Sequence, residues 1–292
     1  MALVYDASNL KTMRLRMLRN VAGALLRGNL KAVLGYIRYL HSRPRVHDFH
    51  DFSMLQLLIC ECGLPLDKTT LNRLLNRNLT IVEFGDGTRY VVMDLEDFYH
   101  ASMCCEAKTL TFVLKQLENG GVFVDVGANI GGYTVRVAKK ARVWAIEPHP
   151  RNFQLLELNV RLNHLQNNVR ALRVAAASSL GKAELFISNH HGRYSLIRKD
   201  GGDTIKRRTI EVDVVPLDLL LADEDHIDVI KIDVEGAEPL VLKGAREALK
   251  RTKVVVVETA FPESFSKAFK ILAMESFKAV KRLDGNAVFI KA

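Results

Sequence analysis

Hydrophobic and polar residues follow two different periods along most of the chain after about residue 80. Short apolar runs rich in β-branched residues alternate with segments whose apolar residues recur every three to four positions. The first pattern predicts buried parallel strands and the second predicts helices that cover them. The predicted strands are 122–126, 142–146, 169–174, 229–232 and 254–257, and the predicted helices between and after them are 130–140, 150–163, 217–222, 237–250 and 262–274. Such alternation indicates an α/β fold built on a parallel sheet.

Three segments depart from this alternation and predict antiparallel pairs. A hairpin is expected around Gly85-Asp86-Gly87-Thr88, and two polar-alternating runs predict an antiparallel insertion. A further hairpin around Asp284-Gly285-Asn286 is expected to end the parallel sheet with an antiparallel element. The paired runs are 81–84 with 89–93, 183–188 with 209–215, and 278–283 with 287–290; a helix is also predicted over 101–117.

The first 80 residues carry a different pattern. Apolar positions spaced for helices occur within 17–25 and 30–40, and the residues opposite them are largely basic. Residues 1–46 hold nine lysines and arginines against Asp6 alone, which accounts for +8 of the net charge of +9. We therefore divide the chain into a basic helical accessory region, 1–80, and a main domain, 81–292. The basic helices either cover the main domain or bind an anionic membrane surface or acidic partner.

Composition places the chain among ordinary globular proteins. Hydrophobic residues make up 48% of the 292 positions and charged residues 26%, which suits a full α/β core with an accessory element. No apolar run approaches 18 residues, and the amino terminus lacks the apolar core of a signal peptide. A cytoplasmic location is expected, with peripheral membrane contact left open by the basic helices.

Candidate chemistry begins in the segment 122–147. Gly127 and Gly131 follow the first strand of the alternation, and Glu147 ends the second. The segment contains neither the GxxxxGK[ST] phosphate loop nor the dinucleotide pattern GxGxxG. Asp125, beside the turn, would repel a pyrophosphate and attract a cation such as a sulfonium. These features favour S-adenosylmethionine, with Asp125 near its methionine part and Glu147 accepting hydrogen bonds from the ribose hydroxyls.

A second group of carboxylates follows the later strands. Asp233 and Glu235 lie just past the strand 229–232, and Glu258 ends the strand 254–257. The carboxyl ends of parallel strands meet at one edge of a sheet, which is where open α/β sheets bind ligands. The same edge is therefore expected to carry both carboxylate groups.

Four separated motifs resemble the FkbM family of S-adenosylmethionine-dependent methyltransferases. They are VDVGANIG at 124–131, IEP at 146–148, IKIDVEGAE at 230–238 and VVVVE at 254–258, in the order of that family. The resemblance covers about residues 80–292. It implies a Rossmann-like class I methyltransferase fold, with a seven-stranded, mostly parallel sheet and a terminal antiparallel hairpin. It also implies methylation of hydroxyl oxygens on sugars, glycolipids or small natural products.

The resemblance and the residue patterns together define the candidate site. The expected cofactor contacts are Asp125, Gly127, Asn129, Gly131, Tyr133, Glu147 and Pro148. The candidates for taking the acceptor proton or positioning the acceptor are Asp233, Glu235, Glu258 and His191. No ligand spacing specifies a metal, so none is expected, although carboxylates at two strand ends could instead hold a divalent cation.

Two other functions remain open at the level of sequence. The basic N-terminal helices would suit an RNA methyltransferase, but few aromatic residues accompany them, and DVEG stands where amino-directed enzymes have an NPPY-type tetrapeptide. Nucleic acid is therefore not the expected partner. A non-catalytic protein that only binds S-adenosylmethionine is the other alternative. The sequence makes no prediction of oligomeric state.

Overall fold

The computed structural model describes residues 45–47, 80–93, 95–187, 194–197 and 208–292. The chain divides into two compact units, one formed by Met1–Gly87 with Val92–Cys104, the other by Thr88–Val91 with Cys105–Ala292. The predicted helices within 17–25 and 30–40 lie outside the described residues. The proposed boundary near residue 80 stays a prediction.

The first unit contains a small antiparallel pair and a helix. Strand β1 (Arg45–His47) pairs with β2 (Thr80–Glu83), and α5 (Leu95–Ser102) follows. The Phe84 and Phe98 rings pack with centroids 5.9 Å apart. The turn at 85–88 separates β2 from β3 (Arg89–Val92), as predicted. The single helix predicted over 101–117 is wrong, because α5 ends at Ser102 and α6 begins at Ala107.

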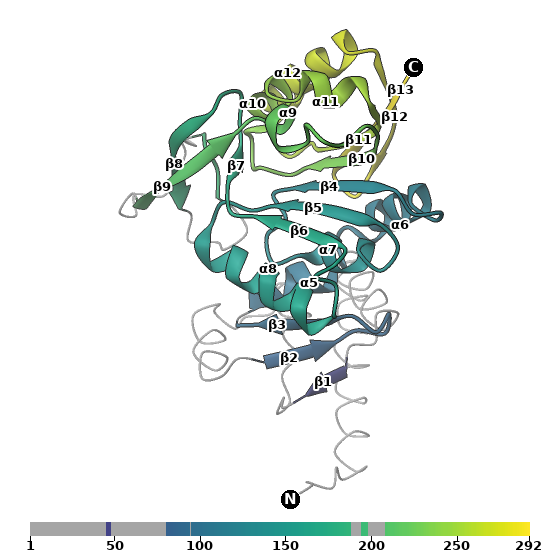
Figure 1. Ribbon diagram of the computed structural model, residues 1–292, viewed down its shortest axis with the longest axis vertical. Helices are drawn as coiled ribbons and strands as arrows, with labels where there is room; N and C mark the ends of the chain where they lie inside the picture. Colours follow the sequence, from purple (N-terminus) through teal and green to yellow (C-terminus); the bar gives the residue numbers. More distant parts are fainter. Residues whose placement is uncertain (1–44, 48–79, 94, 188–193, 198–207) are drawn as a thin grey trace, which may run out of the picture. The chain divides into compact units, whose positions relative to one another are not determined.

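The second unit is built on a seven-stranded sheet (Figure 1). Its strands lie in the order β12-β13-β11-β10-β4-β5-β6, and β13 alone runs in the direction opposite to the other six. The strands are β4 (Val122–Val126), β5 (Arg142–Ile146), β6 (Val169–Leu172), β10 (Ile227–Ile232), β11 (Thr252–Glu258), β12 (Phe277–Leu283) and β13 (Asn286–Lys291). The Rossmann-like class I methyltransferase fold is thereby confirmed. The reversed strand lies one place in from the edge, between β11 and β12.

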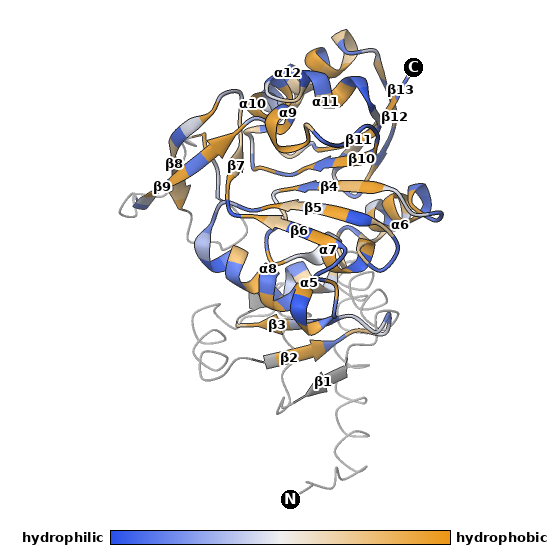
Figure 2. Ribbon diagram, in the orientation of Figure 1, coloured by the Kyte–Doolittle hydropathy of each residue, from blue (hydrophilic) through white to orange (hydrophobic). Residues whose placement is uncertain are grey.

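Helices cover both faces of this sheet, as Figure 1 shows. One face carries α6 (Ala107–Gln116), α7 (Gly132–Val137) and α8 (Pro150–Leu162), and the other carries α9 (Leu217–Leu220), α10 (Glu238–Lys243), α11 (Arg246–Lys250) and α12 (Pro262–Met274). Apolar residues run along the central strands, and polar and apolar residues alternate along α8 (Figure 2). Burial of the apolar faces between these layers is the main stabilising contribution.

One predicted helix is interrupted for a steric reason. The segment 237–250 forms α10 and α11 on either side of Gly244 rather than a single helix. A Cβ atom at Gly244 would lie 2.0 Å from the carbonyl oxygen of Ala177, so only glycine fits this close approach. The long-range contact, which the local pattern does not encode, decides where α10 ends.

A second, smaller sheet contains the predicted antiparallel insertion. Strands β8 (Gly181–Ile187) and β9 (Arg208–Val215) pair antiparallel, and β7 (Ala175–Ala176) pairs parallel with β9. Ser195 bridges to Phe186 and places Tyr194 beside His149. Across the residues described, no helix has the length and apolar character needed to cross a membrane.

Candidate active site

The turn after β4 is shaped by three residues with positive φ. Gly127 has φ 84°, Asn129 has φ 52° and Gly131 has φ 93°. The backbone N–H groups of Gly127 and Ala128 both donate to the carbonyl oxygen of Ile146, at 2.9 and 3.0 Å. A Cβ atom at Gly127 would stand only 1.8 Å from the carbonyl oxygen of Asp233. The turn therefore packs directly against the chain that leaves β10, and Gly127 permits this approach.

Distant side chains fix the start of α7 behind this turn. Gly131 precedes the helix in the left-handed conformation. The Asn159 side chain donates to the carbonyl oxygen of Ile130 at 2.8 Å, and the Tyr90 hydroxyl donates to that of Gly132 at 3.2 Å. These bonds hold the backbone at the start of α7 in place.

Glu147 stands at the carboxyl end of β5 with its carboxylate facing the turn. Its side chain is buried, and its two oxygens accept hydrogen bonds from the backbone N–H groups of Asn129 and His149, each at 2.9 Å. Burial raises the pKa of Glu147 to about 7, although these two N–H groups act in the opposite direction. A carboxylate has about four acceptor positions. Two therefore remain for a pair of ribose hydroxyls, so this residue fits the cofactor expected from the sequence.

Asp125 lies deeper than Glu147, inside the sheet. The residue is 2% exposed, and its Oδ2 accepts a hydrogen bond of 2.6 Å from the Thr134 hydroxyl on α7. Burial raises the pKa of Asp125 to about 6, while Lys231 on the neighbouring strand and Thr134 lower it. The carboxylate therefore joins β4 to α7 beneath the turn. Its contact with the methionine part of the cofactor stays a prediction.

Tyr133 and Pro148 complete the set expected to meet the cofactor. The Tyr133 hydroxyl donates to Glu106 at 2.6 Å, and burial, followed by the Glu106 charge, raises the pKa of this tyrosine. Pro148 is half-buried and leads into His149, whose ring stacks on Tyr194 with centroids 4.1 Å apart. Both residues lie near the turn, and their cofactor contacts stay predictions.

Three of the four predicted catalytic residues come together at the same edge of the sheet. Asp233, Glu235 and Glu258 are each half-buried, and one carboxylate oxygen of each lies within 4.8 Å of the others. Glu235 holds φ 55°, which a residue with a side chain rarely adopts. Such a group could bind a divalent cation, but exposed carboxylates often cluster without one. His191, the fourth candidate, lies outside the described residues.

Glu258 is the most perturbed member of this cluster. Burial, and then the charges of Asp233, Glu235 and Glu238, raise the pKa of Glu258 to about 9. Its Oε2 atom is buried and has no hydrogen-bond partner among the described residues. At neutral pH this carboxyl group therefore holds its proton and can act as a hydrogen-bond donor.

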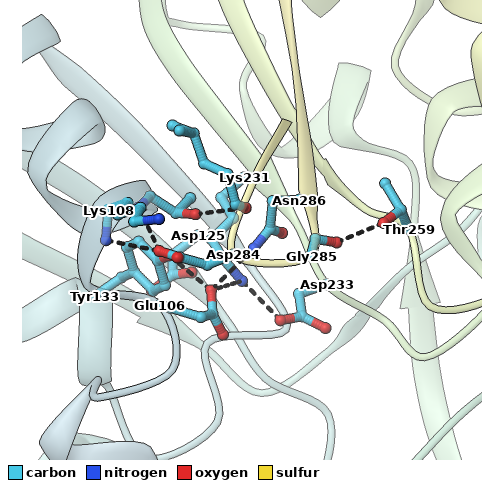
Figure 3. Close-up of polar contacts among 12 residues, drawn as sticks. Glu106, Lys108, Asp125, Tyr133, Lys231, Asp233, Thr259, Asp284, Gly285 and Asn286 are labelled. Carbon is cyan, nitrogen blue, oxygen red and sulfur yellow. Dashed lines mark hydrogen bonds and ion pairs between the residues drawn. The ribbon is translucent and has the colours of Figure 1, made fainter. Parts of the chain in front are cut away.

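Sequence reasoning missed two residues next to the cluster, Glu106 and Asn286. Figure 3 shows both beside Lys231, which donates to Asp233 at 2.7 Å and lies 3.7 Å from Glu106. The Asn286 side chain donates to Glu106 at 3.3 Å. The only local signal was Lys231, a charged residue within an apolar strand, because its partner Glu106 is more than 100 positions away in the sequence.

Comparison with known proteins agrees with this arrangement. The family model described as the Methyltransferase FkbM domain matches residues 125–283, which contain the turn, Glu147 and all three clustered carboxylates. The chain belongs to the FkbM methyltransferase family. It is therefore an S-adenosylmethionine-dependent methyltransferase.

Two known methyltransferases are similar to this chain over most of their own length. Methyltransferase sdnD of Sordaria araneosa is 31% identical over 181 residues, covering 51% of this chain and 70% of that protein. Hexuronic acid methyltransferase AglP of Haloferax volcanii is 32% identical over 178 residues, covering 60% and 71%. Among solved structures, a methyltransferase FkbM from Methylobacillus flagellatus KT has a TM-score of 0.42 at 17% identity, covering 82% of this chain and 66% of that one.

Proposed function

We propose that this FkbM methyltransferase methylates a hydroxyl oxygen of a sugar, glycolipid or small natural product. The cluster of Asp233, Glu235 and Glu258 beside the cofactor turn carries the proposal. An alcohol is a poor nucleophile until a base takes its proton, and carboxylates at the site supply that base. The relative AglP is named for a hexuronic acid, which is a carbohydrate with several hydroxyl groups and one carboxylate.

The cofactor side of the site is assigned to the turn and its neighbours. Asp125, Gly127, Asn129, Gly131, Tyr133, Glu147 and Pro148 are the residues that we propose bind S-adenosylmethionine. Bound there, the cofactor supplies a methyl group on a positively charged sulfur. Glu147 would hold the ribose through its two remaining acceptor positions, and the Gly127 turn lets the backbone approach the ligand closely.

The clustered carboxylates serve two purposes in the proposed transfer. Asp233 or Glu235 takes the proton of the acceptor hydroxyl as the new carbon–oxygen bond forms and the carbon–sulfur bond breaks. Protonated Glu258 donates a hydrogen bond that orients the acceptor oxygen, since its pKa is raised to about 9 by burial and by the nearby carboxylates. Alignment of the acceptor with the methyl group supplies much of the rate enhancement. His191 stays a candidate for acceptor binding.

The experiment is transfer of radiolabelled methyl from S-adenosylmethionine to a panel of acceptors. The panel contains glucuronic and galacturonic acids, neutral sugars, a lipid extract and bulk RNA. We expect label in a carbohydrate or lipid fraction, in a form that resists mild alkali, because a methyl ether survives conditions that hydrolyse a methyl ester. Alkali-labile label would place the methyl on a carboxylate instead, and label in RNA would contradict the proposal.

Two further arms separate the remaining alternatives. With EDTA present we expect incorporation to be unchanged; a loss that Mg²⁺ restores would assign the three carboxylates to a cation. Tight cofactor binding without incorporation into any fraction would favour a non-catalytic protein. Sedimentation with anionic vesicles tests the proposal that residues 1–46, with their charge of +8, bring a cytoplasmic enzyme to a membrane surface.

A further inference from the structure

Lys231 is a charged residue in the centre of the sheet. All six residues of β10 are buried, and Lys231 is 3% exposed. Its neighbours in register are Asp125 on β4 and Val256 on β11. Removing an ammonium group from water is strongly unfavourable unless carboxylates and hydrogen bonds compensate for the lost hydration. The fold therefore retains Lys231 only together with specific partners.

Those partners surround the ammonium group on several sides (Figure 3). Lys231 donates to Asp233 at 2.7 Å, lies 3.7 Å from Glu106, and lies over the Tyr133 ring at 4.7 Å. Burial alone lowers the pKa of Lys231, but the charges of Asp233, Glu106 and Asp125 outweigh burial and hold that pKa above its usual value. The lysine is therefore charged at neutral pH.

The ammonium group is also held through Glu106. Glu106 accepts hydrogen bonds from the Tyr133 hydroxyl at 2.6 Å and from the Asn286 side chain at 3.3 Å. It directly precedes α6, whose first turn is bound by Asp284 of the β12–β13 turn. Glu106 thus belongs to a packed arrangement of helix and hairpin, and it holds Lys231 in place.

Strand geometry places the Lys231 ammonium group beside the proposed catalytic cluster. Residues two apart on a strand point to the same face, so Lys231 and Asp233 share the face on which α6 packs. The Lys231 side chain runs along the strand and reaches Asp233, which follows the last residue of β10. The carbonyl oxygen of Asp233 is the atom that excludes any side chain at Gly127. The charge-assisted bond from Lys231 therefore fixes the orientation of the Asp233 carboxylate beside the Gly127 turn.

We propose that Lys231 is a positioning residue, which holds the Asp233 carboxylate in the orientation that methyl transfer requires. Lys231 acts through Asp233 and takes no part in bond making. Glu106 serves in turn to place Lys231. This inference rests on the part that the proposed function gives to Asp233, and it adds two residues to the machinery of the site.

A crystallographic comparison tests the geometry without any acceptor. Wild type and Lys231→Met are crystallised with S-adenosylhomocysteine. We expect the Asp233 carboxylate to adopt a different side-chain rotamer in Lys231→Met, while the Gly127 turn keeps its conformation. An unchanged Asp233 rotamer would overturn the inference. Lys253→Met is the control, because Lys253 on β11 makes a 2.9 Å bond to Asp228 near the amino end of β10, the end opposite Asp233.

A double-mutant cycle on turnover tests the chemistry, with the acceptor found in the panel. Lys231→Met is expected to lower kcat about tenfold to a hundredfold, the range expected when a reacting group is misplaced by about 1 Å, with KM for S-adenosylmethionine changed less than about threefold. In the Asp233→Asn background the same substitution is expected to lower kcat less than about threefold, because residues that act through one another are not additive. Lys253→Met leaves kcat unchanged.

The outcomes separate this inference from the proposed function. Equal losses of kcat in both backgrounds would show that Lys231 acts independently of Asp233, which overturns the inference and leaves the role of Asp233 intact. Wild-type turnover in Asp233→Asn alone would instead overturn the proposed role of Asp233. If Lys231→Met does not fold, both experiments use the double variant Glu106→Gln/Lys231→Met and compare it with Glu106→Gln. The double variant also removes a carboxylate charge that Lys231 neutralises.

Discussion

At the scale of single residues, this site is built from carboxylates that the fold buries. Burial raises the pKa of Asp125, Glu147 and Glu258, to about 6, 7 and 9. Each buried carboxylate destabilises the fold when ionised, unless hydrogen bonds or a cation compensate. Several buried carboxylates at one sheet edge suit a site that binds a cationic ligand and takes a proton from an acceptor hydroxyl.

Glu147 gives this arrangement a pH dependence that can be measured. Its folded-state pKa of about 7 exceeds the ordinary value of 4.5, so its contribution to stability falls as pH rises from about 4.5 to 7. In the proposed site, the ribose hydroxyls donate to the ionised form of Glu147. Calorimetry should therefore show the affinity for S-adenosylhomocysteine rising about tenfold from pH 6 to pH 8. Glu147→Gln should bind weakly with little change over this range; a wild-type slope in that variant would place the titrating group elsewhere.

Gly127 occupies a position at which the fold leaves no room for a side chain. Gly127→Ala places a methyl group against the Asp233 carbonyl oxygen and strains the backbone at φ 84°. We expect its free energy of unfolding in urea to fall by about 3 kcal/mol or more. Gly285→Ala is the control, since Gly285 has φ 96° and open space where a Cβ atom would lie. Its loss should be about 1 kcal/mol, from backbone strain alone. Similar losses in both variants would show that the contact with Asp233 contributes nothing.

At the scale of elements, the β12–β13 turn does more than reverse the chain. Asp284 accepts hydrogen bonds from the backbone N–H groups of Lys108 and Thr109, at 2.6 and 3.0 Å. The Glu106 side chain makes no such capping bond, so a residue from the far end of the chain caps α6. The sequence Asp284-Gly285-Asn286 predicted the turn, but it did not predict that the turn would cap α6.

Two substitutions at Asp284 separate the cap from the backbone conformation. Asp284→Gly keeps the left-handed conformation, φ 50° in the wild type, and removes the acceptor. Its free energy of unfolding is expected to fall by about 1 kcal/mol, the usual contribution of an N-terminal cap. Asp284→Asn keeps both the acceptor and the conformation, so urea unfolding should show a change within about 0.5 kcal/mol. Equal losses in the two variants would mean that charge, not the hydrogen bonds, holds α6.

At the scale of the whole molecule, the site assembles from segments far apart in the sequence. Glu106, the turn after β4, Glu147, Asp233 and Glu258 come from five separate stretches of the second unit. Parallel strands make this assembly possible, because their carboxyl ends all lie along one edge. The catalytic role of each carboxylate stays a prediction, and so do the acceptor, the membrane contact and the expectation that no metal is used.

The sequence alone determined the strands and most of the helices of the second unit, the fold class and the family, and it predicted the sheet edge at which we propose that the cofactor binds. These depend on local periodicity, glycine positions and short motifs, which any stretch of chain displays by itself. Only the tertiary structure revealed the break at Gly244, the capping of α6 by Asp284 and the placement of Lys231 between Asp233 and Glu106. Each depends on atoms brought together by the folding of distant segments, and a local pattern carries no record of such a contact.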